Sequence, residues 1–413
     1  MDNNIKTDFE TTFKNSLSKN ELIIKEDFLN KFIENGFPSK KLENWKFSDL
    51  NQIINKNIGK LSFYNDTTKV NKFDNSIQIN SFEHNKIVFI NGKLQEIDFK
   101  FEEKNCIQIL NDNKISLDKL SKNALLYLNC AFSDRNHKIL IKKNYQMKKP
   151  LAVYHVTNNE IESKNINLQL DFVLEENTCL KVLDIFHDKS EKNFINIFYN
   201  FDLKKDSVLK NFKIDKLGNN NIKYSFNNIN QDQNSISENF ILSCGSNFLK
   251  NEINCNLNGM YSSAFINGIF DLSDNNHHEI RTKVNHMVEN TKSYQLIKSI
   301  LNDNSKAVYQ GKIYVNSEAQ KTDGYQLSKA ILLNKNSEFN AKPELEIYAD
   351  DVKCSHGSAS GSLNENSIFY LRSRGLNYLE SKRLLINGFM LDVVEKITDN
   401  EIKNFIKKIM DLN

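Results

Sequence analysis

Hydrophobic positions in the first part of the chain follow a helical spacing. They recur on one predicted helix face at Phe28, Leu29, Phe32 and Ile33. Gly36 follows this stripe as a stop signal, and the segment 42–54, which includes the only tryptophan, Trp45, is predicted to be a second helix. Residues 1–85 are therefore expected to form a helical N-terminal region.

From residue 86 the hydrophobic pattern changes to a period of two, which is typical of β-strands. The run 87–90 is predicted to be a strand that ends at the favoured turn pair Asn91-Gly92. Short alternating segments then recur up to residue 350, separated by connectors rich in Asn, Asp and Ser. Their apolar positions include Ile253, Cys255 and Leu257, then Ala264, Ile266, Phe270 and Leu272, and finally Leu345, Ile347 and Ala349.

So many short strands fit either a sandwich or barrel, or a solenoid. The asparagines at the predicted corners favour the solenoid, because asparagine tolerates the left-handed backbone conformation that sharp corners require. We therefore expect a mainly β protein whose core, residues 86–350, is a β-helix.

A helical spacing returns in the C-terminal part, residues 351–413. One apolar stripe consists of Ile386, Phe389, Met390, Val393, Val394 and Ile397, and a second runs from Ile402 to Met410. Between them, Thr398-x-x-Glu401 has the form of a helix capping box. The first helix would cover the open end of the β-helix. Capping does not need the second stripe, which is typical of a helix that docks onto a partner.

Composition narrows the function classes. Lys and Arg number 55 against 52 Asp and Glu, a net charge of +3, and this balance argues against a nucleic-acid groove. The first residues do not have the pattern of a signal peptide, and no apolar run approaches the ~18 residues of a membrane span. The six cysteines include no Cys-x-x-Cys pair, which fits the reducing cytoplasm.

The sequence lacks P-loop, dinucleotide-binding, metalloprotease and serine-hydrolase motifs. Its densest group of reactive side chains is 350–357, Asp-Asp-Val-Lys-Cys-Ser-His-Gly. Cys354 and His356 are two positions apart, so their side chains share a face if the preceding strand continues. A thiolate and an imidazole form half of a soft-metal site for iron–sulfur or zinc, and the other ligands would come from elsewhere. Alternatively, Cys354 is simply a small buried residue and His356 a hydrogen-bonded turn residue.

Other candidate residues favour structural roles. His277 and His278, followed by Glu279, are predicted to lie in a solvated loop, since adjacent strand residues face opposite ways. His286 and Cys255 fall on apolar alternations and are expected in the core. Trp45 is expected to be a packing anchor.

Two C-terminal segments carry a family resemblance. The segment 342–357, Lys-Pro-Glu-Leu-Glu-Ile-Tyr-Ala-Asp-Asp-Val-Lys-Cys-Ser-His-Gly, and the segment 369–375, Phe-Tyr-Leu-Arg-Ser-Arg-Gly, resemble the signature of the SufB/SufD family of iron–sulfur cluster assembly proteins. The segments 310–313 and 319–322 and the motif around Trp45 are also similar to that family. The Cys-Ser-His-Gly form and the cysteine-free N-terminal region resemble the SufD branch. The segment 358–360, Ser-Ala-Ser, is a conservative departure.

The resemblance implies a right-handed parallel β-helix with helical flanks, acting as a non-catalytic cytoplasmic scaffold. It implies a SufB-type subunit and a SufC-type ATPase as partners, with neither nucleic acid nor membrane involved. No stably bound cofactor is expected, but an iron ion or iron–sulfur cluster would be shared transiently with SufB. His356 is implicated in assembling it, with Cys354 beside it. The SufC contact is expected within about 366–413, with candidate residues Phe369, Arg372, Arg374, Phe389, Lys403, Phe405 and Lys407.

Two alternatives are a SufB-like sister subunit and a carbohydrate-active β-helix enzyme. The enzyme would need carboxylates clustered on one face of the β-helix. Asp350 and Asp351 are adjacent and would face opposite ways in a strand, which weakens that interpretation.

Overall fold

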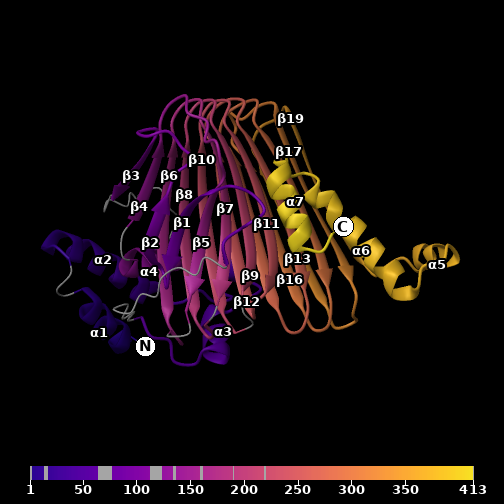
Figure 1. Cartoon of the computed structure of the whole chain (residues 1–413), viewed down its shortest axis with the longest axis horizontal. Coiled ribbons are helices and arrows are strands. Elements are labelled where there is room, and N and C mark those ends of the chain that lie inside the picture. Colours follow the sequence, from indigo (N-terminus) through magenta and orange to yellow (C-terminus); the bar gives the residue numbers. More distant parts are fainter. Residues whose placement is uncertain are drawn as a thin grey trace.

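The computed structural model of the chain describes residues 2–13, 17–63, 77–111, 123–133, 136–158, 161–188, 190–217 and 220–412. These residues form two long β-sheets, and successive strands from β4 onward alternate between the sheets (Figure 1). Neighbouring strands within each sheet run parallel, except for the antiparallel pairs β1–β2 and β3–β4. This topology is a parallel β-solenoid flanked by helices, so the prediction of a solenoid over a sandwich is confirmed.

The first sheet has ten strands, ordered from the C-terminal edge. They are β19 (Val352–Gly361), β17 (Thr322–Leu332), β15 (Lys292–Leu301), β13 (Ser263–Leu272), β11 (Ile236–Gly245), β9 (Val208–Leu217), β7 (Cys179–Asp188), β5 (Leu151–Thr157), β1 (Asn85–Ile90) and β2 (Lys93–Asp98). The second has nine strands. They are β18 (Glu338–Ile347), β16 (Lys306–Val315), β14 (His277–His286), β12 (Phe248–Leu257), β10 (Ile222–Gln231), β8 (Phe194–Leu203), β6 (Asn165–Leu174), β4 (Asn136–Ile141) and β3 (Ile107–Asn111).

Corner residues with positive φ allow the chain to turn from one sheet to the other. Asn177, Asn234 and Asn290 adopt this conformation, as predicted for asparagine, and so do Tyr261 and Lys321. The predicted turn at Asn91-Gly92 also has positive φ at both residues and joins β1 to β2.

Helices cover part of the outer face of each sheet. The N-terminal helices are α1 (Asp2–Phe13), α2 (Lys19–Asn35), the 3-10 turn η1 (Glu43–Trp45), α3 (Leu50–Asn57) and, inserted later in the chain, α4 (Ala124–Phe132). They share a buried cluster with outward residues of the nine-stranded sheet, such as Phe198 and Tyr224. The C-terminal helices are α5 (Glu365–Ser373), α6 (Tyr378–Val394) and α7 (Asn400–Ile409). The prediction of one helix over 42–54 is wrong, since this segment divides into η1 and the first part of α3.

The C-terminal helices do not cap the end of the solenoid. Met390 and Val393 of α6 and Ile402 and Ile406 of α7 pack on the outer face of the ten-stranded sheet. The predicted capping of the last coil is therefore wrong. The interpretation of the α7 stripe as a face not needed within the chain, and therefore free to dock onto a partner, is also wrong. The predicted capping box is also wrong: the side chain of Asp399 accepts from the Ile402 N–H, while Thr398 donates to Glu238. Among the described helices, none is long and apolar enough to cross a bilayer.

Trp45 is a packing anchor, as predicted. Its side chain is 1% exposed, and its ring lies 5.8 Å from that of Tyr224 and 6.4 Å from that of Phe248. The Lys250 ammonium lies 4.4 Å from the indole centroid, and it also donates to the Asn44 carbonyl and pairs with Glu279. The loop around Trp45 is thereby fixed to the nine-stranded sheet.

We expect Trp45→Ala to lower the free energy of unfolding by ~3 kcal/mol, because a large buried aromatic leaves a cavity. Denaturant unfolding of the isolated chain measures this loss, with Leu42→Ala as the control because Leu42 is 49% exposed. Unchanged stability of the Trp45 variant, together with a lost partner, would instead make Trp45 a contact residue.

The interior of the solenoid is apolar over most of its length but contains a buried charged cluster. Lys213 of β9 lies 3.0 Å from Asp184 of β7, which also contacts His155 at 2.8 Å and Tyr199 at 2.7 Å. Burial would raise the pKa of Asp184, but the Lys213 ammonium and His155 outweigh it and hold that pKa below its ordinary value. Burial lowers the pKa of Lys223, which pairs with Asp215 nearby, to about 8.

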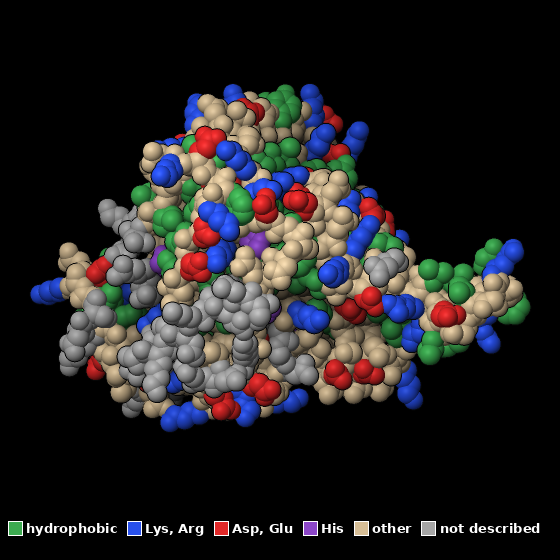
Figure 2. Space-filling model, in the orientation of Figure 1, with side chains coloured by type: hydrophobic (Ala, Val, Ile, Leu, Met, Phe, Trp, Pro, Cys, Tyr) green, Lys and Arg blue, Asp and Glu red, His purple; other side chains and the backbone are tan. Residues whose placement is uncertain are grey.

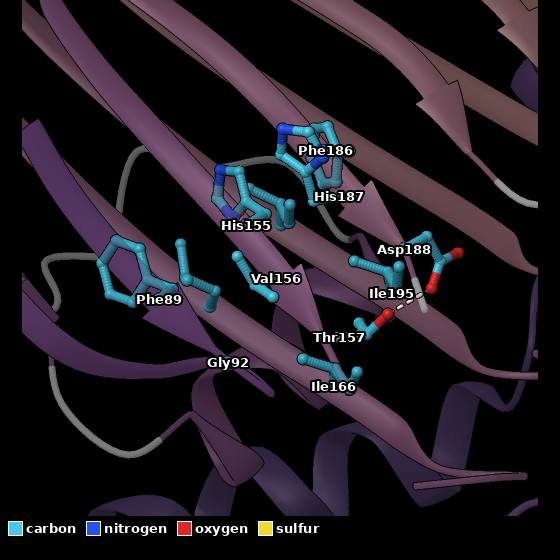
Figure 3. A pocket seen from close by; sticks show the side chains of 12 residues that line it. Phe89, Gly92, His155, Val156, Thr157, Ile166, Phe186, His187, Asp188 and Ile195 are labelled. Carbon is cyan, nitrogen blue, oxygen red and sulfur yellow. Dashed lines mark hydrogen bonds between the residues drawn. The ribbon is translucent and has the colours of Figure 1, made fainter. Parts of the chain in front are cut away.

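A cavity of about 20 Å³ adjoins this cluster between Phe89, His155, Thr157 and Asp188 (Figure 3). Its volume suits a single water molecule. Thr157 donates a hydrogen bond to Asp188 at its edge. The cavity is too small for an organic ligand, and we assign it no function.

The structure places His286 and the segment 277–279, for which the sequence predicted different environments, on one strand of the solenoid. His286 is fully buried and bonds Thr291 at 2.7 Å and Ser293 at 2.9 Å, so its predicted core role is confirmed. The predicted solvated loop at 277–279 is wrong, because these residues lie in β14. His278 is buried there against Ser243.

Candidate functional site

The solenoid ends in two edge strands, β18 and β19, whose side chains are exposed or only half-buried. Each strand is paired on one side only, β18 with β16 and β19 with β17. A turn at 348–351 separates them, and hydrogen bonds of Asp351 with Lys321 and Gln320 hold this turn on the preceding coil. The C-terminal end of the solenoid is therefore an open coil.

Cys354 and His356 both lie on β19 and face the solenoid interior. Their register partners on β17 are Gly324 and Gln326, which are buried. The prediction that the two side chains share a face is confirmed, although they lie on a new strand and not on a continuation of the strand from Leu345.

The two candidate ligands differ in exposure. Cys354 is half-buried and packs against a small apolar cluster that includes Ile313 and Ala349. Burial raises the pKa of the Cys354 thiol, and a backbone hydrogen bond from Gly324 offsets part of that rise. A soft metal would therefore have to displace the thiol proton on binding. His356 is exposed and has no hydrogen-bond partner among the described residues.

The site does not contain a complete ligand set within the part of the chain that the structure describes. No group of three or more His, Cys, Asp or Glu side chains there could hold a metal ion. Asp350 and Asp351 are exposed in the turn before β19. The thiol and the imidazole therefore supply two ligands, and a tetrahedral iron site needs about two more from another molecule.

The seven residues predicted to contact an ATPase do not form one surface. Phe369, with its side chain 74% exposed, and the exposed Arg372 and Arg374 lie on or just after α5, which protrudes beyond the solenoid (Figure 1). Phe389 is half-buried, with the Lys298 ammonium 4.3 Å from its ring centroid. Phe405 is half-buried against Phe82.

The two α7 lysines are also engaged within the chain. Lys403 and Lys407 both pair with Glu395, which immediately follows α6. Their ammonium groups are thus used to hold α7 against the end of α6. We define the protruding arm as residues 364–384, which comprise α5 and the first part of α6. Its exposed apolar residues are Phe369, Tyr370, Tyr378, Leu379 and Leu384.

Figure 2 shows acidic and basic side chains intermixed over one face of the molecule, and hydrophobic side chains on the protruding arm at its right. The described residues on this face form no continuous basic patch of the kind that binds a nucleic-acid backbone.

The fold and the site define a β-solenoid that presents a thiol and an imidazole at an open end, without a complete ligand set among the described residues. Comparison with known proteins identifies its family. The SufBD core domain of the SUF system for iron–sulfur cluster assembly matches residues 156–389. The chain therefore belongs to the SufBD family, which confirms the resemblance, and it is an iron–sulfur cluster assembly subunit of the SUF system.

Individual relatives agree with this assignment. SufD of Escherichia coli (strain K12) is 27% identical over 384 residues, which cover 91% of this chain and 89% of that protein. SufD of Plasmodium falciparum is 25% identical over 312 residues, which cover 74% of this chain and 20% of that protein. The SufBD family protein slr0076 of Synechocystis is 37% identical over 103 residues, or 25% of this chain and 23% of that protein.

Proposed function

We propose that this chain is a SufD-like scaffold subunit that contributes Cys354 and His356 to a nascent iron–sulfur cluster site, shared with a SufB-type subunit. The observation that carries this proposal is the thiol–imidazole pair at the open last coil. The cluster is cargo, so no cofactor stays bound to this chain. The similarity to a SufD protein extends over nearly the full length of both chains, which favours this role over that of the SufB-like sister subunit.

The open coil also supports the choice of partner. Unpaired edge strands readily accept another strand, because their backbone N–H and C=O groups have no protein partner on one side. A SufB-type solenoid that paired with β18 and β19 would continue both sheets. It would also bring its own side chains to Cys354 and His356, where the missing ligands are needed.

A scaffold role fits the lack of nucleotide-binding motifs in the sequence, because a separate SufC-type ATPase would supply the energy. We place the complex in the cytoplasm because all six cysteines are free thiols, as is usual in a reducing compartment. A carbohydrate-active enzyme has no structural observation in its favour.

The protruding arm is the best candidate for the SufC contact within 366–413. Side chains such as Phe369 and Leu379, each 74% exposed, are costly to leave in water and suit a hydrophobic groove on a partner. The arm continues into the rest of α6, which Lys298 fastens to the ten-stranded sheet through Asp392 and the Phe389 carbonyl. A pull on the arm would therefore act on the solenoid near the last coils.

Phe369→Ala together with Leu379→Ala should weaken SufC binding about tenfold or more, ~1.4 kcal/mol, because exposed aromatic and aliphatic anchors dominate such contacts. A pull-down with both partners measures this and should show SufB pairing retained. The comparison variant is Lys403→Glu with Lys407→Glu. A larger SufC loss from the lysine variant would place the contact on α7, and lost SufB with retained SufC would mean that the two interfaces are exchanged.

A further inference from the structure

The sulfur atom of Cys354 leans away from the open edge of the last coil. Cys354 on β19 is the register partner of Gly324 on β17. Neighbouring strands lie about 4.7–4.9 Å apart, so the Cβ atoms of two register partners are separated by about that distance. A Cβ atom at Gly324 would nevertheless lie only 3.3 Å from Cys354 Sγ. The sulfur is therefore directed over β17, toward the preceding coil.

The sulfur rests in a niche that exists because residue 324 has no side chain. Gly324 is buried, and a Cβ atom there would also lie 3.4 Å from two methyl groups of Ile313 on the opposite sheet. Both distances are shorter than the best separation of non-bonded heavy atoms. Ile313 is fully buried in the apolar cluster against which Cys354 packs. A side chain at 324 would therefore displace the sulfur, which is the less enclosed of its two neighbours.

The row of inward-facing positions that ends at Cys354 shows that the other coils do not require glycine here. The members that precede Gly324 in register are Ser237, Ala264 and Ser293, and each of them has a Cβ atom. Gly324 does not have a positive φ, so its backbone conformation does not require glycine either. Glycine inside a strand often marks a close approach by another group. At Gly324 that group is the Cys354 thiol.

The niche affects when the thiol can act as a ligand. The missing ligands would arrive with the partner at the open edge, where His356 is already exposed. A sulfur packed over β17 has to rotate about χ1 before it can join them. The apparent affinity of a site is reduced by the fraction of molecules that have the binding-competent conformation. The packing at Gly324 therefore lowers the affinity of the resting chain for a soft metal.

We propose that Gly324 is a positioning residue for Cys354: it keeps the thiol against β17 in the chain without cargo, and ligation requires the sulfur to rotate outward to the open edge. This inference rests on the proposed function, because that function brings cargo to the edge. The step is a rotation about one side-chain bond, so no covalent bond forms or breaks. A side chain at 324 would fill the niche and favour the outward rotamer in advance.

Alkylation of the full chain by iodoacetamide, with the modified cysteines mapped by mass spectrometry, tests the resting position. Gly324→Val should make Cys354 react about fivefold faster, because crowding that drives a side chain out of its rotamer shifts the equilibrium by roughly this factor. Gly324→Ala should have a smaller effect in the same direction, and it provides the test if the valine variant does not fold. The matched control is Gly361→Val, since Gly361 ends β19 and a Cβ atom there meets nothing within 4 Å. Its Cys354 should react at the wild-type rate.

Zn²⁺ binding to the same chains, measured by calorimetry, tests the outward rotation. Thiolate and imidazole ligands both suit Zn²⁺. Gly324→Val should bind Zn²⁺ about fivefold more tightly, because a thiol that is already outward no longer reduces the binding-competent fraction. This gain should disappear when Cys354→Ser is added. General damage to the last coil would weaken binding and could not produce the gain.

Unchanged alkylation of Cys354 in both Gly324 variants would overturn this inference, and so would slower alkylation with weaker Zn²⁺ binding. Equal acceleration in Gly361→Val would also overturn it, because the effect would then be a general loosening of the last coil. A gain in Zn²⁺ affinity that persists without Cys354 would do the same. Failure of the proposed function gives a different result: complexes with SufB- and SufC-type partners would contain normal amounts of cluster in both His356→Ala and Cys354→Ser, whatever the alkylation rates are.

Discussion

His356→Ala is expected to fold, to join its partners and to lose cluster assembly. The side chain is exposed and makes no hydrogen bond within the described residues, so its removal costs little stability. The cluster would lose a ligand that the other described residues cannot replace. Cluster content should fall to the background of the assay, while the melting temperature and the partner pull-down stay at wild-type values.

Lys353→Ala is the matched control, because Lys353 is exposed on the same strand but faces the opposite way. It should assemble clusters normally. Cys354→Ser should have a smaller effect than His356→Ala, and the reverse order would mean that the thiol is the more important ligand. Normal cluster content in His356→Ala would contradict the assignment of the site.

Lys213→Met is expected to destabilise the chain by ~3–5 kcal/mol, because it leaves the buried carboxylate of Asp184 without its cation. Lys213 is fully buried, and its ammonium also donates to Ser225 at 3.0 Å, so water cannot replace it without opening the solenoid. Denaturant unfolding measures the loss. The control is Lys192→Met, whose pair with Glu162 is largely exposed and should contribute less than ~1 kcal/mol.

The pH dependence of this difference has a definite sign. In the wild type the pKa of Asp184 lies below its unfolded value, so its stabilising contribution is present above the unfolded pKa and is lost as the pH falls. Without Lys213, burial makes protonation of Asp184 favourable. The stability gap between wild type and variant should therefore narrow as the pH falls toward ~4, where Asp184 of the variant becomes protonated, and narrow further below it. A gap under ~1 kcal/mol at neutral pH, or one that widens in acid, would show that this cluster does not hold the coils together.

The local features of the fold followed from the sequence because they depend on short spacings. The alternation around Cys255 and the shared face of Cys354 and His356 need only neighbouring residues. The buried ion pair could not be predicted from the sequence, because Lys213 and Asp184 lie on different turns of the solenoid. Glu279 was predicted to lie in solvent for the same reason, since its partner Lys250 lies on another strand. The register that brings such residues together is set by the lengths of the corners.

The C-terminal helices show a second limit of prediction from the sequence. Their apolar stripes were evident, but a stripe does not say which surface covers it. Ile402 and Ile406 pack on the outer face of the ten-stranded sheet, whereas Phe369 and Leu379 have no cover within the described residues.

The central claim is that this chain completes a cluster-assembly site together with its partners. The most direct measurement is the iron and sulfide content of complexes purified anaerobically after co-expression with SufB- and SufC-type chains, compared with the same partners expressed without this chain. Iron and acid-labile sulfide in roughly equal amounts, present only when this chain is included, would agree with the claim. The claim would be contradicted if the partners without this chain contained as much iron and sulfide as the full complex. It would also be contradicted if a stable three-protein complex acquired neither iron nor sulfide.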